Sequence, residues 1–225
     1  KKFLHFIGRA TWDRVGVQMF LRGKYLSDCW TTMAPTKNRA RVVNDAVQKI
    51  LAMNSPVGYK RDMIEYVLNP PKNTLTDDTR EDLISFPNNV TKLQHLYTNA
   101  FVEIVHETDI NSFFITEKTI RPILFKKPFI IMGCQGYMEG MKKLGFETFD
   151  SILDESYDTV LNPTDRMKTA CESLKTFIDR PLQECIKDLK RIEKILEHNY
   201  QNIISLSEKN KINLKQAKTF DNAGL

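Results

Sequence analysis

The sequence predicts an α/β protein with a doubly wound parallel sheet and a long helix near its carboxyl end. Three observations support this fold class. Short apolar runs rich in β-branched and aromatic residues recur along the chain, helical patterns separate them, and polar residues begin abruptly where two of the runs end. Strands that alternate with helices pair in parallel, and such sheets bind ligands beyond the carboxyl ends of their strands.

The first unit is a strand, a turn and a helix. Phe3 to Ile7 is apolar, Gly8 to Thr11 reads as a turn, and a helical pattern begins at Arg14. An amphipathic helix is predicted over 42–51. Residues 53–89 show little periodicity and many Pro, Asn and Asp residues, which predicts irregular connections around short elements.

A second unit follows a short helix around Leu93 to Tyr97. The run 101–105 predicts a buried strand, and polarity begins at His106 and Glu107. Thr116 is placed to cap a helix, because apolar residues follow it at helical spacing. A further strand is predicted from Pro128 to Met132, ending at Gly133.

Helices dominate the rest of the chain. One helix ends at Gly145, which can adopt the left-handed conformation of a C-cap. Another is predicted over 164–178, and a long helix begins at Pro181 with apolar residues at 3.6-residue spacing. We therefore divide the chain into a Rossmann-like domain, 1–178, and a helical extension, 179–225.

Composition excludes several classes of protein. The 225 residues are 41% hydrophobic with a formal net charge of +5, and the basic residues are scattered rather than gathered into one patch. No apolar run is long enough to cross a bilayer and no signal peptide is visible, so we expect a soluble intracellular protein of the cytoplasm, or of the host cytoplasm if the chain is viral. Because the chain begins at Lys1, we expect a piece of a longer protein.

The cysteines and histidines do not suggest a metal site. Four cysteines lack CxxC spacing, and none of the four histidines has another at i+4. We therefore expect reduced cysteines and no metal. His106 alone falls in the expected crevice, where it is either a hydrogen-bonded structural residue or a catalytic or ligand-contacting one.

The start of the predicted helix at Thr116 carries the strongest functional signal. A helix start favours a phosphate, Lys118 would add a positive charge, and Glu117 could accept hydrogen bonds from the two hydroxyls of a ribose. The alternative is that Glu117 only supports the helix cap and Lys118 is solvated. The spacing of Gly8, Gly16 and Gly23 does not form a GxGxxG motif, so a nicotinamide dinucleotide is not indicated.

The segments Ile115 to Lys118 and Lys127 to Gly133 resemble the donor-binding half of glycosyltransferases with two Rossmann-like domains (GT-B type). They are similar to the ITEK-type motif of α1,3-fucosyltransferases, and more closely to a group of phage- and virus-associated glycosyltransferase-like proteins. In that group TEKT, PF-I-I-G, GF-TF and DESYD occur together, as they do here between Thr116 and Asp158. Together these motifs span about a quarter of the chain.

The resemblance implies roles for individual residues. Glu117 would contact the nucleotide ribose and Lys118 the diphosphate, with Thr116 and Gly133 beside the donor. An arginine-rich loop follows the first strand in the virus-associated group, which Arg9 and Arg14 resemble; each could bind a phosphate or be solvated. This chain has Val105 to Thr108 where the fucosyltransferases have a Phe-Glu-Asn motif, which leaves the sugar and the base unassigned.

We therefore predict a metal-independent glycosyltransferase, or its donor-binding half. It would transfer a sugar from a nucleoside-diphosphate sugar to a glycan or other hydroxyl acceptor, held by an acceptor-binding domain outside this chain. The leaving diphosphate would be stabilised electrostatically, and His106 or Glu107 would be the general base or contact the donor. The carboxylates of 154–158 either position the donor or close a loop. Two alternatives remain: a non-enzymatic nucleotide- or glycan-binding module, and a protein that modifies or binds nucleic acid.

Overall fold

The computed structural model describes residues 1–7, 10–33, 39–69 and 90–209. Within these residues a four-stranded, all-parallel sheet has the order β2-β1-β3-β4. Its strands are β1 (Phe3–Ile7), β2 (Cys29–Met33), β3 (Val102–His106) and β4 (Phe129–Met132). The chain moves from β1 to β2 in one direction and then places β3 and β4 on the other side of β1. The strand order therefore reverses between β1 and β3, and this is the point at which open α/β sheets bind ligands.

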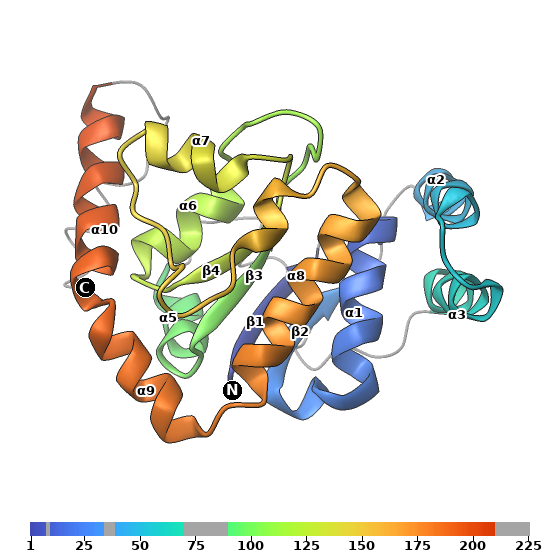
Figure 1. Cartoon of the computed structure of the whole chain (residues 1–225), viewed down its shortest axis with the longest axis horizontal. Coiled ribbons are helices and arrows are strands. Elements are labelled where there is room, and N and C mark those ends of the chain that lie inside the picture. The colour runs from blue at the N-terminus through green and yellow to red at the C-terminus, as the bar shows by residue number, and fades with distance from the viewer. Residues whose placement is uncertain (8–9, 34–38, 70–89, 210–225) are drawn as a thin grey trace.

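Helices cover both faces of the sheet (Figure 1). On one face lie α1 (Trp12–Lys24) and α8 (Pro163–Ile178), where the Phe177 ring meets Phe3 edge-on at 5.9 Å. On the other lie α5 (Val90–Thr98) and α6 (Glu117–Leu124), and α5 packs on Leu4 and Phe6. Because neither face meets water, the strands are continuously buried runs. The predicted α/β class with a parallel sheet wound on both faces is confirmed.

Local signals placed several boundaries correctly. Thr116 is the N-cap of α6, and its Oγ1 accepts a hydrogen bond from the Lys118 backbone N–H at 3.2 Å. Gly145 follows α7 (Tyr137–Lys143) with φ +85°, and the amides of Gly145 and Phe146 donate to the carbonyls of Lys142 and Met141. That pair of bonds is the Schellman motif, which needs a residue without a Cβ penalty at its left-handed position.

Two helices pack together outside α1. They are α2 (Arg39–Ala52), at the predicted amphipathic segment, and α3 (Val57–Leu68), which packs on both α2 and α1. The prediction of irregular connections around short elements over 53–89 did not include a helix as long as Val57–Leu68, which has 12 residues. Met63, Tyr66 and Val67 are buried on one side of α3, a stripe too short to stand out in the sequence. The remainder of that segment, 70–89, lies outside the described residues.

The long carboxyl-terminal helix is two helices, α9 (Leu182–Arg191) and α10 (Glu193–Glu208), which correct the prediction of one continuous element. Ile192 ends the first and precedes the second, and Figure 1 shows the chain changing direction there. Ile192 is fully buried. The bend lets one apolar stripe continue into the core, since Cys185, Ile192 and Ile203 belong to the same cluster of buried side chains as the sheet. The described part of 179–225 thus packs on the sheet domain.

The segment 154–158 supports the turn before α7 and the core beneath it. Asp158 accepts hydrogen bonds from the amides of Met138 at 3.0 Å and Glu139 at 3.3 Å, at the start of α7. Glu155 accepts from the Phe149 amide at 2.7 Å, and the buried Tyr157 hydroxyl accepts from the amide of Ile131 in β4. Of the two interpretations given to this acidic segment, these contacts favour loop closure.

Candidate site at the carboxyl edge of the sheet

An aspartate–histidine pair lies where the strand order reverses. His106 is the last residue of β3, and Asp13 is in the first turn of α1, directly after the β1–α1 connection. The Asp13 Oδ2 lies 3.0 Å from the His106 Nδ1, and both residues are buried. Asp13 is not recognisable from the sequence as a site residue, because its partner is 93 residues away and only the order of the strands brings them together.

Electrostatics fix the protonation of this pair near neutral pH. Burial lowers the pKa of His106, more than the adjacent carboxylate raises it. Burial opposes ionisation of Asp13, but the interactions with His106, and after them the charge of Arg14, outweigh it and hold the pKa of Asp13 below its usual value. A neutral imidazole therefore donates its Nδ1–H to an ionised carboxylate, and the lone pair is at Nε2.

A second histidine extends the pair along the sheet. The ring centroid of His5 in β1 lies 5.0 Å from that of His106. Gln18 in α1 lies with its Nε2 2.9 Å from the Nδ1 of His5, and also donates to the hydroxyl of Thr31. Burial lowers the pKa of His5 well below its usual value. Among the described residues neither histidine Nε2 has a hydrogen-bond partner, so two buried imidazole nitrogens lie at the β1–β3 junction.

The crevice beside this pair is nearly filled. A cavity of only about 10 Å³ touches Asp13 and Gly133 and is closed by side chains that include Ile110 and Arg166. Such a space holds about one water molecule. Arg166 is itself held by the carbonyls of Val160 at 2.7 Å and Ile110 at 3.3 Å.

The structure describes one of the two predicted donor-binding arginines. Arg14 lies beside the pair, with its Nη2 3.5 Å from the carbonyl oxygen of His106. Arg9 lies outside the described residues. Arg14 is therefore directed at the carboxyl end of β3, where His106 lies.

Glu107 is the central acceptor of a hydrogen-bond network at the start of α6. Its carboxylate accepts bonds from the Thr116 amide at 3.1 Å, the Thr116 hydroxyl at 2.5 Å and the Thr119 hydroxyl at 2.6 Å. The Tyr137 hydroxyl adds a bond at 3.2 Å, and the Thr108 amide adds one at 3.3 Å. Glu107 is 2% exposed. Its oxygens are thus committed to the loop and helix that they join.

Glu117 and Lys118 lie at the accessible end of the same helix. The Glu117 side chain is 56% exposed, and the Lys118 ammonium lies 2.7 Å from its Oε1. Lys118 Nζ also donates to the hydroxyl of Thr108 at 3.1 Å and lies 3.4 Å from that of Thr116. Because the amides of Thr116 and Lys118 already have protein acceptors, the Lys118 ammonium is the group here best placed to meet a phosphate.

Gly133 lies at the end of β4, where a glycine is needed for close packing. A Cβ at this position would lie 2.6 Å from the Tyr137 ring, whose hydroxyl is bonded to Glu107. Gly133 therefore lets the edge of β4 approach the Glu107 network.

The structure thus divides the predicted site residues into two neighbouring groups. His106, at the end of β3, lies with Asp13 and Arg14 in the first turn of α1. Glu107, Thr116, Glu117 and Lys118 lie at the start of α6. Successive residues of a strand point to opposite faces, which is why the adjacent His106 and Glu107 belong to different groups. Sequence reasoning missed Thr119 and Tyr137, whose hydroxyls reach Glu107. The only local signal for Thr119 was its place one helical turn after Thr116.

Two further observations concern metal sites and membrane-spanning helices. Over the described ranges, no group of three or more His, Cys, Asp or Glu residues is arranged to hold a metal ion. None of the helices in those ranges combines the length and apolarity required to cross a bilayer.

Comparison with known proteins adds no relative. The chain matches no family model, no curated protein and no solved structure.

Proposed function

We propose that the carboxyl edge of the sheet binds a nucleoside-diphosphate sugar, and that the chain is a metal-independent glycosyltransferase or the donor-binding half of one. The observation that carries this proposal is the arrangement of Lys118 and Glu117 at the exposed start of α6. Two threonine hydroxyls hold the Lys118 ammonium, and the half-exposed Glu117 carboxylate lies beside it. Both groups lie at the edge where parallel α/β sheets bind nucleotides.

Each of these groups has a defined partner in the proposed complex. The diphosphate replaces the Glu117 carboxylate as the ion partner of Lys118, which stabilises the negative charge as the nucleoside diphosphate leaves. The released Glu117 accepts hydrogen bonds from the ribose hydroxyls. Glu107 and Thr116 hold the start of α6 in place and act as positioning residues.

The transfer step itself needs a base. The acceptor hydroxyl attacks the anomeric carbon, the carbon–oxygen bond to the diphosphate breaks with its electrons going to the diphosphate, and the hydroxyl proton passes to a base. His106 and Glu107 are both 2% exposed, and the Glu107 oxygens already accept five hydrogen bonds. This burial favours positioning roles for both residues, with the base supplied by the acceptor-binding part of the enzyme.

Calorimetric titration with UDP, GDP and their sugar conjugates tests the binding step. We expect one nucleotide to bind, and Lys118→Ala to weaken it about 10-fold to 100-fold, the worth of one charge-assisted hydrogen bond. Lys143→Ala is the matched control, because Lys143 is an exposed lysine on α7 whose side chain is 74% exposed. Equal affinity in wild type and Lys118→Ala, or the absence of nucleotide binding to the chain, would contradict the proposal.

A binding module without turnover is the second candidate, and the filled crevice favours it. The space beside Asp13 and Gly133 is about 10 Å³, too small for a sugar ring. Release of the nucleoside diphosphate from the nucleotide sugar, followed over hours, identifies a complete transferase. Turnover that depends on Lys118 supports the transferase, whereas tight binding without turnover supports either the module or a donor-binding half whose base lies in another domain.

A further inference from the structure

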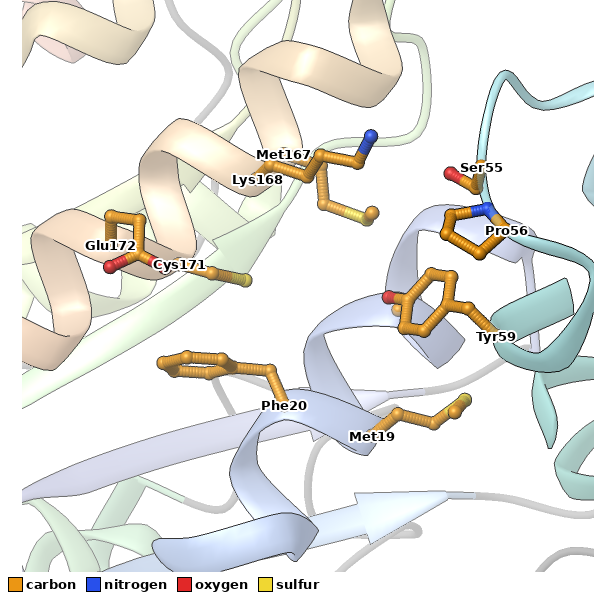
Figure 2. Close-up of a pocket in the computed structure, with 10 residues that line it drawn as sticks. Met19, Phe20, Ser55, Pro56, Tyr59, Met167, Lys168, Cys171 and Glu172 are labelled. Atoms are coloured by element: carbon orange, nitrogen blue, oxygen red, sulfur yellow. The ribbon is translucent and has the colours of Figure 1, made fainter.

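A second cavity lies between α1, α8 and the start of α3, and none of the residues proposed to bind the nucleotide lines it. Its volume is about 410 Å³, within the range of small-molecule sites in proteins. Figure 2 shows its walls: Met19 and Phe20 come from α1, Tyr59 from α3, and Met167 and Cys171 from α8.

The backbone geometry explains how three helices come to share this space. Gly16 lies on the side of α1 that faces α8, and a Cβ there would lie 2.5 Å from the Met167 Sδ. The missing side chain lets Met167 reach α1. The α2–α3 pair then packs on the outside of α1, and Tyr59 forms the outer wall.

The chemistry of the walls favours an aromatic ligand. The thioethers of Met19 and Met167 and the thiol of Cys171 lie around the same space as the rings of Phe20 and Tyr59 (Figure 2). Sulfur atoms and ring edges interact favourably with aromatic rings beyond simple burial of area. Burial raises the pKa of Cys171 to about 12, so its thiol is an uncharged part of the cavity wall and not a nucleophile.

One polar group in the wall needs a partner. Ser55 lines the cavity, its Oγ is buried, and among the described residues it has no hydrogen-bond partner. A buried hydroxyl without a partner is destabilising, and a ligand hydroxyl or amine could supply the hydrogen bond that it lacks. Burial, with a smaller contribution from Cys171, also raises the pKa of Tyr59, so its phenol remains a neutral donor and acceptor.

We propose that this cavity binds a small planar aromatic molecule that carries one hydrogen-bonding substituent directed at Ser55. The ring would lie between Phe20, Tyr59 and the methionine thioethers. The site is separate from the proposed nucleotide site, so each can fail without the other.

The methionines provide a direct readout. The chain has 8 methionines, and ¹³C-methyl labelling gives each an NMR signal. With 2-naphthol as the probe, we expect saturable shifts of Met19 and Met167 and none of Met138 or Met141. Decahydro-2-naphthol, the saturated counterpart, should bind about tenfold more weakly because it loses the sulfur–aromatic and ring–ring contacts.

Variants locate the probe. Met19→Trp fills the cavity and should weaken binding at least about tenfold, read from Met167, whereas Leu182→Trp adds the same ring at an exposed position and should leave it unchanged. Ser55→Ala removes only a hydroxyl and should weaken the binding of 2-naphthol severalfold, whereas Lys118→Ala should leave that binding unchanged. The proposal is overturned if no shift saturates, if Met138 and Met141 shift equally, if the saturated probe binds as tightly, or if Met19→Trp and Ser55→Ala both bind like wild type.

Discussion

Replacing Glu107 tests whether it holds the start of α6. In Glu107→Ala the buried Thr116 amide loses its acceptor, and three hydroxyls lose a charged one. The hydroxyls of Thr119 and Tyr137 lie 3.1 Å apart and can bond each other. The remaining loss is one unsatisfied buried amide at about 1–3 kcal/mol and one or two charge-assisted bonds, so unfolding should become easier by about 3–5 kcal/mol. Glu107→Gln keeps one acceptor oxygen and should cost about 1–2 kcal/mol.

Urea unfolding followed by far-ultraviolet circular dichroism measures both changes at fixed pH. Glu139→Ala is the control, because Glu139 is a carboxylate near the same loop with a side chain 60% exposed, and it should change stability by less than about 0.5 kcal/mol. A Glu107→Ala variant within about 1 kcal/mol of wild type would refute the reasoning. It would mean that water replaces the carboxylate in the network.

Three further predictions concern buried charges. The pKa values of His5 and His106 are lowered in the fold, so the unfolded chain binds more protons than the folded chain at acidic pH. The free energy of unfolding should therefore fall as the pH drops below about 6.5, by up to about 1.4 kcal/mol per pH unit for each histidine. His5→Gln should flatten that slope in unfolding titrations between pH 7 and 5, and an unchanged slope would contradict the lowered pKa of His5. Partial burial raises the pKa of Glu155 to about 7, so the fold holds this proton more tightly than the unfolded chain does. The stability that the proton contributes is lost as the pH rises through about 7, so Glu155→Gln should become more stable relative to wild type between pH 5 and 8. A difference that stays constant with pH would contradict the raised pKa. Arg121 and Glu103 form a buried ion pair, with Nη2 2.6 Å from Oε1. Arg121→Met should therefore destabilise the protein by about 3–5 kcal/mol, and the double variant with Glu103→Gln by less, which a double-mutant cycle of thermal unfolding would measure. Additive losses would mean that the two residues are not coupled.

What could be predicted from the sequence was local. The Thr116 cap and the Gly145 Schellman motif depend on residues within one helical turn, so their signals lie side by side in the chain. The break at Ile192 could not be seen, because the apolar spacing continues across it and the bend follows from where the core lies. Strand β2, Cys29–Met33, was not predicted. Its five residues carry two threonines, so no continuous apolar run marks it.

The candidate site was predictable in part for the same reason. Thr116, Glu117 and Lys118 are consecutive and share one helix start, and the structure places them together there. The pairing of Asp13 with His106 depends on α1 following the strand next to β3, which only the topology determines. Glu107 was identified as a candidate from its position after a strand. Its bonds to Thr119 and Tyr137 require two further elements to converge, and no pattern in the sequence reports that.

The central position of β1 has a consequence for synthesis of the protein. β1 can pair with β2 as soon as residues 3–33 have emerged, but its other edge pairs with β3, which begins at Val102. At the usual pace of about 5–20 residues per second, that edge is unpaired on the ribosome for roughly 4–15 seconds. An open strand edge invites pairing with other chains. The nascent chain is therefore most exposed to aggregation before β3 is made, and binding by a chaperone during that interval would protect it more than at any later stage.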